Sequence, residues 1–151
     1  MTDQTARQKA VLGLEGAFGE LMGEFRRVYA QAAESVSPGM LPGTYKVLST
    51  IQRLDSITVS GLAERMAADK GQVSRSVSEL EDLGLVERTT DAADGRIKLI
   101  TVTDEGRARI QRARQPYEGR LTEVLDDWPI DTIEKLTELL HALAVGETPA
   151  S

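Results

Sequence analysis

Few residues in this sequence are equipped for catalysis. There is no cysteine, and the single histidine, His141, lies in an apolar stripe typical of a helix that packs in a core or against another subunit. No nucleophile is paired with a base, no glycine-rich phosphate loop is present, and no Glu/Asp cluster has the spacing of a metal site. The sequence therefore predicts a protein that is not an enzyme and uses no cofactor or metal.

Arg75 is the long cation on the outer face of an expected helix. A wheel of about 100° per residue places Val73, Val77 and Leu80 on one narrow apolar stripe. Small or polar side chains lie opposite: Gly71, Ser74, Arg75, Ser78 and Asp82. Such a slim face permits close approach to DNA, and an arginine can bond O6 and N7 of a guanine in the major groove. Backbone amides at the helix start, near Lys70 and Gly71, suit a phosphate.

A second arginine, Arg96, follows Asp94-Gly95 in the polar stretch "RTTDAADGRIKL" (88–99). A solvated turn explains the aspartates and the glycine but not the cation. A single arginine at a hairpin tip suits a narrow A·T-rich minor groove, where negative potential is concentrated. Asp94 either orients the guanidinium through a charge-assisted bond or only forms the turn.

The segments around these arginines predict a helix-turn-helix followed by a hairpin. Thr58 can cap a short helix, and after a turn of about three residues Asp69 can cap a longer one, with Gln72 completing a capping box. Gly84 suits the end of that second helix. "LVERTT" and "IKLITV" then predict two strands. This order of elements is a winged helix, with the hairpin beside the recognition helix.

Long helices are expected on both sides of this lobe. Residues 7–34 contain no proline and repeat apolar residues in heptad steps at Val11, Leu14, Phe18, Leu21, Phe25, Val28 and Ala32. A helix roughly 40 Å long exceeds the needs of a small domain, which favours burial against another subunit; the alternative is burial against the chain's own C-terminal helices. Prolines at 38 and 42 break it before a helix over 44–53. Thr103 starts a helix expected to reach residue 126 with a kink at Pro116, and a final amphipathic helix carries Ile130, Ile133, Leu136, Leu140 and Leu143.

The predicted fold is mainly α with a small β-hairpin wing. It comprises a helical dimerisation lobe (1–35 and 127–151), a winged helix-turn-helix lobe (36–102) and a long helix linking them (103–126). No apolar run approaches 18 residues, and the N-terminus lacks the pattern of a signal peptide, so we expect a cytoplasmic protein without a membrane partner.

The formal charge of −6 argues against general coating of nucleic acid, though not against a local DNA-reading face. Between residues 64 and 98, six cations face eight anions, so affinity would depend on a few placed cations. The richest basic run comes later, at Arg107, Arg109, Arg112 and Arg114; it is either a phosphate contact or a solvated helix face.

The stretch "VSRSVSELEDLGLVERTTDAADGRIKLITVTDEG" (73–106) resembles the DNA-binding segment of the MarR family, the multiple antibiotic resistance regulators. In that family V-S-R-x-x-x-x-L-E-x-x-G-L-V-x-R leads into D-x-R at the wing and L-T-x-x-G at the next helix. Here these are Val73–Arg88, Asp94–Arg96 and Val102–Gly106, with Val102 in place of leucine. Gly71 departs from a usually hydroxylated position, so the phosphate contact is either missing or made by the backbone. The resemblance implies a homodimer built by the first and last helices, with an effector pocket between lobes.

These arguments predict a ligand-responsive repressor that binds a palindromic promoter site on double-stranded DNA as a homodimer; an activator is the alternative mode. The predicted DNA-binding residues are Lys70, Gly71, Gln72, Ser74, Arg75, Ser78, Asp94 and Arg96. The effector, by resemblance an aromatic acid or antibiotic, would meet Met22, Phe25, Arg26, Tyr29, Met40 and Tyr45. Cysteine-based oxidant sensing is excluded. The alternative functions are a winged helix for protein–protein contact, which the acidic lobe favours, and another winged-helix regulator of the PadR or ArsR type.

Overall fold

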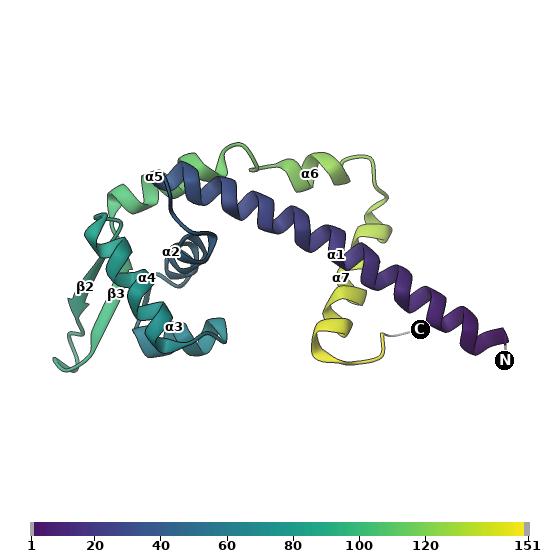
Figure 1. The fold of residues 1–151 in the computed structure, drawn as a ribbon, viewed down its shortest axis with the longest axis horizontal. Coiled ribbons are helices and arrows are strands. Elements are labelled where there is room, and N and C mark those ends of the chain that lie inside the picture. The colour runs from purple at the N-terminus through teal and green to yellow at the C-terminus, as the bar shows by residue number, and fades with distance from the viewer. Residues whose placement is uncertain (1, 150–151) are drawn as a thin grey trace. The chain divides into compact units, whose positions relative to one another are not determined.

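A computed structural model describes residues 2–149 of the chain. The fold is mainly helical with one small antiparallel sheet, as predicted (Figure 1). It divides into two compact units, one ending at Gln115 and the other beginning at Pro116. None of the helices described is long and apolar enough to cross a lipid bilayer.

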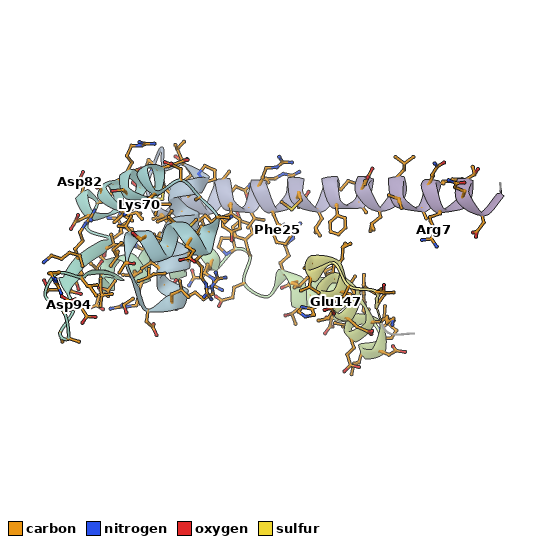
Figure 2. The ribbon with its side chains drawn as sticks, turned by 90° about the horizontal axis from the view of Figure 1, so that it is seen from below. Arg7, Phe25, Lys70, Asp82, Asp94 and Glu147 are labelled. Carbon is orange, nitrogen blue, oxygen red and sulfur yellow. The ribbon has the colours of Figure 1, made fainter. Side chains whose placement is uncertain are left out.

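The first helix, α1 (Thr2–Val36), is longer than the predicted 7–34. It packs on α2 and α5 through its C-terminal end, where Ala32, Ala33 and Val36 are buried. Further toward the N-terminus, the predicted heptad residues are exposed within this chain, among them Val11, Leu14, Leu21 and Phe25. Figure 2 labels Phe25 on this stretch of α1. Most of the apolar seam of α1 is therefore uncovered by its own unit.

The predicted helix-turn-helix is confirmed. After α2 (Pro42–Leu54), Thr58 caps α3 (Val59–Met66) by accepting from the Gly61 N–H at 3.0 Å. Asp69 caps α4 (Lys70–Asp82) by accepting from the Gln72 N–H at 2.9 Å. Leu62, Ala63 and the inner face of α4 join one hydrophobic core with α1, α2, α5 and the sheet. This core fixes which side of α4 faces outward.

The hairpin is also confirmed, with one addition. Strands β2 (Val86–Thr90) and β3 (Lys98–Val102) pair antiparallel, with Arg88 opposite Ile100. A third strand, β1 (Ser56–Ile57), pairs with β3 and gives the order β1-β3-β2. Sequence analysis missed β1 because two residues are too short to show the alternation of polar and apolar side chains that marks a strand.

The prediction of one long helix over 103–126 is wrong. The structure has α5 (Asp104–Arg114) and a separate short α6 (Arg120–Leu125), followed by α7 (Ile130–Val145). Pro116 has no N–H to continue the hydrogen-bond ladder, and Gly119 adopts a φ of +86°, which a right-handed helix excludes. The chain breaks here instead of kinking, and the boundary between the two units falls at the same place.

A tight junction joins the end of α4 to the start of α5. Gly84 has a φ of +72° just after α4, and the Leu85 N–H returns to the Leu80 carbonyl at 2.9 Å. Thr103 caps α5 by accepting from the Gly106 N–H and donates its own hydroxyl to the Gly84 carbonyl at 2.6 Å. A Cβ on Gly106 would overlap the carbonyl oxygen of Leu85. Thr103 and Gly106 thus set the placement of α5 against the helix-turn-helix.

In the second unit, the predicted apolar stripe of α7 lies mostly in solvent. Its exposed apolar residues are Ile130, Leu136, Leu139, Leu140, Leu143 and Val145. His141 is exposed as well, so it is not part of a core within this chain. Of the residues described in this unit, only Ala142 is a buried hydrophobic.

Candidate nucleic-acid interface

The outer face of α4 carries the first group of predicted DNA-binding residues. Val73, Val77 and Leu80 are almost fully buried, so the predicted inward stripe is confirmed. The structure leaves the following residues exposed on α4: Lys70, Gly71, Gln72, Arg75 and Ser78; Ser74 is half-buried. Figure 2 labels Lys70 at the start of α4 and Asp82 at its end. The structure therefore brings these six predicted residues onto one accessible helix.

Arg75 extends back over the first turn of α4. A Cβ on Gly71 would lie only 3.8 Å from Nη1 of Arg75 and 3.1 Å from Oδ1 of the capping Asp69. The approach to Asp69 is tight, whereas the distance to Arg75 is an ordinary van der Waals contact, so Gly71 matters for the cap and not for the position of the guanidinium. A cation at the positive end of a helix dipole gains little from its own helix, and in the part of the chain described here no ion pair neutralises Arg75. The guanidinium is thus available to acceptors outside the protein.

The wing holds the second group. Asp91 Oδ1 accepts from the N–H groups of Ala93 and Asp94 at 2.7 and 3.0 Å, which folds the tip. Asp94 Oδ1 accepts from the Arg96 backbone N–H at 3.0 Å and from its Nε at 3.3 Å. Asp94 therefore contacts both the backbone and the guanidinium of Arg96, so it does more than form the turn. The Arg96 side chain is 92% exposed, which leaves it free to reach a partner.

Arg88 links the wing to α4, a role that sequence analysis did not assign to it. Its Nε lies 3.1 Å from Oε2 of Glu81, and its Nη2 donates to the Ser78 hydroxyl at 3.4 Å. Ser78, one of the predicted DNA-binding residues, is thus also part of a structural bridge. The sequence carries only a weak signal for this contact. Glu81 and Arg88 both match the motif of the family, but a separation of seven positions across a turn does not show that the two side chains meet.

A groove of about 530 Å³ lies between the segment 37–40 and the outer face of α4. From α4 and the residue after it, the groove is lined by Ser74, Arg75, Ser78, Glu79, Asp82 and Leu83. Glu79 is positioned by the buried Thr44, whose hydroxyl donates to its Oε2 at 3.1 Å. The charges of α4 are therefore divided along its length, with cations in the N-terminal half and carboxylates toward the C-terminus.

The arginine run on α5 is partly structural. Arg107 donates to the Val102 carbonyl at 2.7 Å and pairs with Asp104. Arg109 pairs with Glu105 at 2.6 Å and donates to the carbonyl of Val36, the last residue of α1, at 3.1 Å. The hydrogen bond from Arg109 lowers the pKa of the Glu105 carboxyl. Arg107 thus ties the start of α5 to the end of β3, and Arg109 ties α5 to α1. Neither interpretation of the run from the sequence included this structural role.

The six predicted effector-binding residues occupy different environments. Tyr29 and Tyr45 meet edge to face with ring centroids 5.6 Å apart, and burial raises the pKa of the Tyr45 phenol. Met40 is buried and lines the groove beside α4. In contrast, Met22, Phe25 and Arg26 are exposed on α1. The structure brings the two tyrosines together but does not gather the whole set, and their role in effector binding stays a prediction.

Comparison with known proteins agrees with this architecture. The MarR family model matches residues 39–97. A putative transcriptional regulatory protein for the hcr operon of Thauera aromatica is 30% identical over 142 residues, covering 88% of this chain and 85% of that protein. YxaD, an uncharacterised HTH-type transcriptional regulator of Bacillus subtilis, is 28% identical over 118 residues, covering 78% and 82%.

A solved structure supports the same assignment. It is a mutant MarR from E. coli complexed with operator DNA, which is 25% identical with a TM-score of 0.60, covering 84% of this chain and 93% of that one. The recognised motifs, the winged helix and these relatives agree, and none points to an enzyme family. The chain belongs to the MarR family of transcriptional regulators.

Proposed function

We propose that this chain is a sequence-specific DNA-binding regulator that reads a palindromic promoter site as a homodimer. The observation that carries the proposal is the pairing of two exposed arginines on one winged helix: Arg75 on the outer face of α4 and Arg96 at the wing tip. The similarity to HTH-type transcriptional regulators and to the operator-bound MarR structure supports it.

In this proposal α4 enters the major groove by its N-terminal half. The small side chains of Gly71 and Ser74 permit close approach, and Arg75 bonds the edge of a guanine. The free backbone N–H groups of the first turn, near Lys70, receive a phosphate of the DNA backbone. Gln72 and Ser78 flank this contact and supply further polar groups to the same site.

The wing contributes by a different chemistry. Arg96 enters the minor groove beside each half-site, where narrow A·T-rich sequence concentrates negative potential. Asp94 holds the arginine backbone and Nε, which reduces the freedom that the side chain loses on binding. Specificity in the flanks would then depend on groove width instead of base hydrogen bonds.

We also propose that residues 1–35 and 127–151 form the dimerisation lobe, with 36–102 as the reading lobe. Residues 103–126 link them as two helices, α5 and α6, instead of one. The exposed apolar residues of α1 and α7 support this, because large apolar side chains that recur along an exposed helix are typical of an interaction surface. Two recognition helices related by a two-fold axis then read half-sites about one helical turn apart.

The finer points of the proposal are the mode of regulation and the signal. A repressor released by a small molecule, such as an aromatic acid or an antibiotic, is consistent with the family. The ring pair of Tyr29 and Tyr45 offers an aromatic surface for such a ligand. A regulator that contacts the chromosome of a bacterium acts in the cytoplasm, which is where we place this one.

A titration against DNA tests the proposal. The full chain is added to a labelled duplex recovered by selection from a random-sequence library, and the dissociation constant is measured over a series of salt concentrations. We expect tight binding, and the logarithm of the association constant should fall linearly with the logarithm of the salt concentration. If the chain recovers no preferred duplex and shows no salt-dependent binding, the winged helix is an adapter for proteins and the proposal is wrong.

A further inference from the structure

We propose that Glu79 and Asp82 act as specificity determinants by repelling the DNA backbone from the C-terminal half of α4. The inference rests on the proposed function and deepens it, since it concerns how the same face distinguishes its site from other DNA. Both residues line the groove beside α4, in which Arg75 is the cationic side chain among the lining residues.

No ion pair within the described residues neutralises these two carboxylates. The neighbouring Glu81 is neutralised by Arg88 at 3.1 Å. For Glu79 and Asp82, in contrast, no cationic partner lies within ion-pair distance among residues 2–149. Their negative charge therefore remains directed at whatever approaches the groove.

Glu79 is also held in position. The Thr44 hydroxyl donates to its Oε2 at 3.1 Å, and Thr44 is only 3% exposed. Thr44 lies in the first turn of α2, where the positive end of the helix dipole favours a nearby carboxylate. A Glu79 side chain held by this hydrogen bond cannot easily turn away when a phosphate approaches.

This arrangement affects specific and nonspecific binding unequally. Nonspecific affinity comes almost entirely from phosphate contacts, so any approach that lays the backbone along the groove is penalised by like-charge repulsion. An approach led by the N-terminal half of α4 keeps the phosphates away from the carboxylates and allows Arg75 to reach a base. Penalising the wrong geometries raises the ratio of specific to nonspecific affinity without adding any contact to the correct site.

The test compares two double variants that raise the net charge equally. Glu79→Gln with Asp82→Asn removes both carboxylates, and glutamine retains an oxygen that can accept from Thr44. The control, Asp126→Asn with Glu118→Gln, makes the same change on exposed residues of the segment that links the two lobes. Thermal unfolding checks that each variant is folded. Dissociation constants are measured for the duplex selected by the wild type and for a scrambled duplex of equal length and composition.

We expect the groove variant to bind the scrambled duplex about threefold to tenfold more tightly at low salt. Its affinity for the selected duplex should change less, so that the specificity ratio falls, whereas the control should stay within about twofold of the wild type on both duplexes. Equal tightening on both duplexes, or no change on either, would overturn the inference. Weaker binding of the selected duplex would also overturn it, because the carboxylates would then be contacting bases. If the wild type prefers neither duplex, the proposed function itself fails first.

Discussion

Arg75 is the residue on which the proposed base reading depends. Arg75→Ala should weaken binding of the preferred duplex by about 1–3 kcal/mol and relax the preference at one symmetric base pair. Arg75→Lys should restore only part of the affinity, because lysine lacks the planar pair of donors that matches O6 and N7 of guanine. Titration of each variant against single-base variants of the duplex measures both effects.

An equal loss on every duplex would show instead that Arg75 contacts a phosphate. The lysine variant would then restore most of the affinity, since a point charge suffices at a phosphate. The two outcomes differ in which sequences are affected, so a general loss of folding cannot imitate the predicted one.

At the scale of single residues, the sequence predicts which side chains are exposed better than it predicts which side chains bond to one another. The helical wheel places Arg75 outside and Val73 inside correctly, because both follow from the period of one helix. The bridge from Arg88 to Glu81 and Ser78 is not predictable in this way, since it joins two elements whose relative placement depends on the core. For the same reason the structural roles of Arg107 and Arg109 are not visible in the basic run.

Among the elements, the wing makes the sharpest prediction. Arg96→Ala should leave the fold and oligomeric state unchanged, because the side chain is 92% exposed and its bond to Asp94 lies within the same turn. It should weaken DNA binding, and the loss should be larger when the flanks of the half-sites are A·T-rich. The measurement is a titration of wild type and variant against duplexes that differ only in their flanks.

Asp94→Ala serves as the companion variant. It keeps the cation but removes both of the hydrogen bonds that hold it, so its loss should be smaller than that of Arg96→Ala. Equal affinity of wild type and Arg96→Ala for every duplex would show that Arg96 does not contact DNA and is only part of a solvated turn.

The junction between α4 and α5 is packed so closely that a single added methyl group should lower the stability of the fold. Gly106→Ala should lower the free energy of unfolding by about 1–3 kcal/mol or more, because the added Cβ would overlap the Leu85 carbonyl and force the helices apart. Chemical denaturation measures the loss. Gly43→Ala is the matched control: nothing lies within 4 Å of its Cβ, so stability should not fall. A Gly106→Ala protein as stable as the control would contradict this packing.

The elements that the sequence predicts well are those specified locally. Caps at Thr58 and Asp69 and the glycine after α4 define the helix-turn-helix within a few residues each. The hairpin follows from two alternating strands around a polar turn. The helix over 103–126 is broken in the structure because Pro116 and the positive φ of Gly119 act together, where a proline alone would allow a kink. Strand β1 exists only because β3 offers it a partner.

At the scale of the molecule, the exposed apolar residues of α1 and α7 predict self-association. Light scattering at micromolar concentration should give about twice the mass of the 16.4 kDa chain. A double variant with aspartate at both Leu14 and Phe25 should be monomeric, because each unpaired carboxylate would be buried in the dimer interface at a high cost in free energy. Both residues are about half exposed in the single chain, at 50% and 51%, so the monomer itself should remain folded. A wild-type monomer at that concentration would remove the basis for two-fold DNA reading.

Because the whole chain is acidic, the positions of its cations matter more for DNA binding than their number. With a net charge of −6, the protein has little general attraction for DNA, so binding must come from a few cations in fixed positions. The sequence alone indicates this balance, because charge counts need no structure. It does not reveal that Glu79 and Asp82 line the same groove as Arg75, since that depends on how the segment 37–40 folds against α4.

Selection of duplexes from a random-sequence library by the wild-type chain tests the central claim most directly. The account predicts enrichment of one palindromic sequence whose half-sites are centred about one helical turn apart, roughly 10 base pairs. A guanine at a symmetric position in each half-site should be the base whose preference is lost with Arg75→Ala. Recovery of unrelated sequences, or of a single asymmetric site, would contradict the claim that two copies of α4 read DNA together.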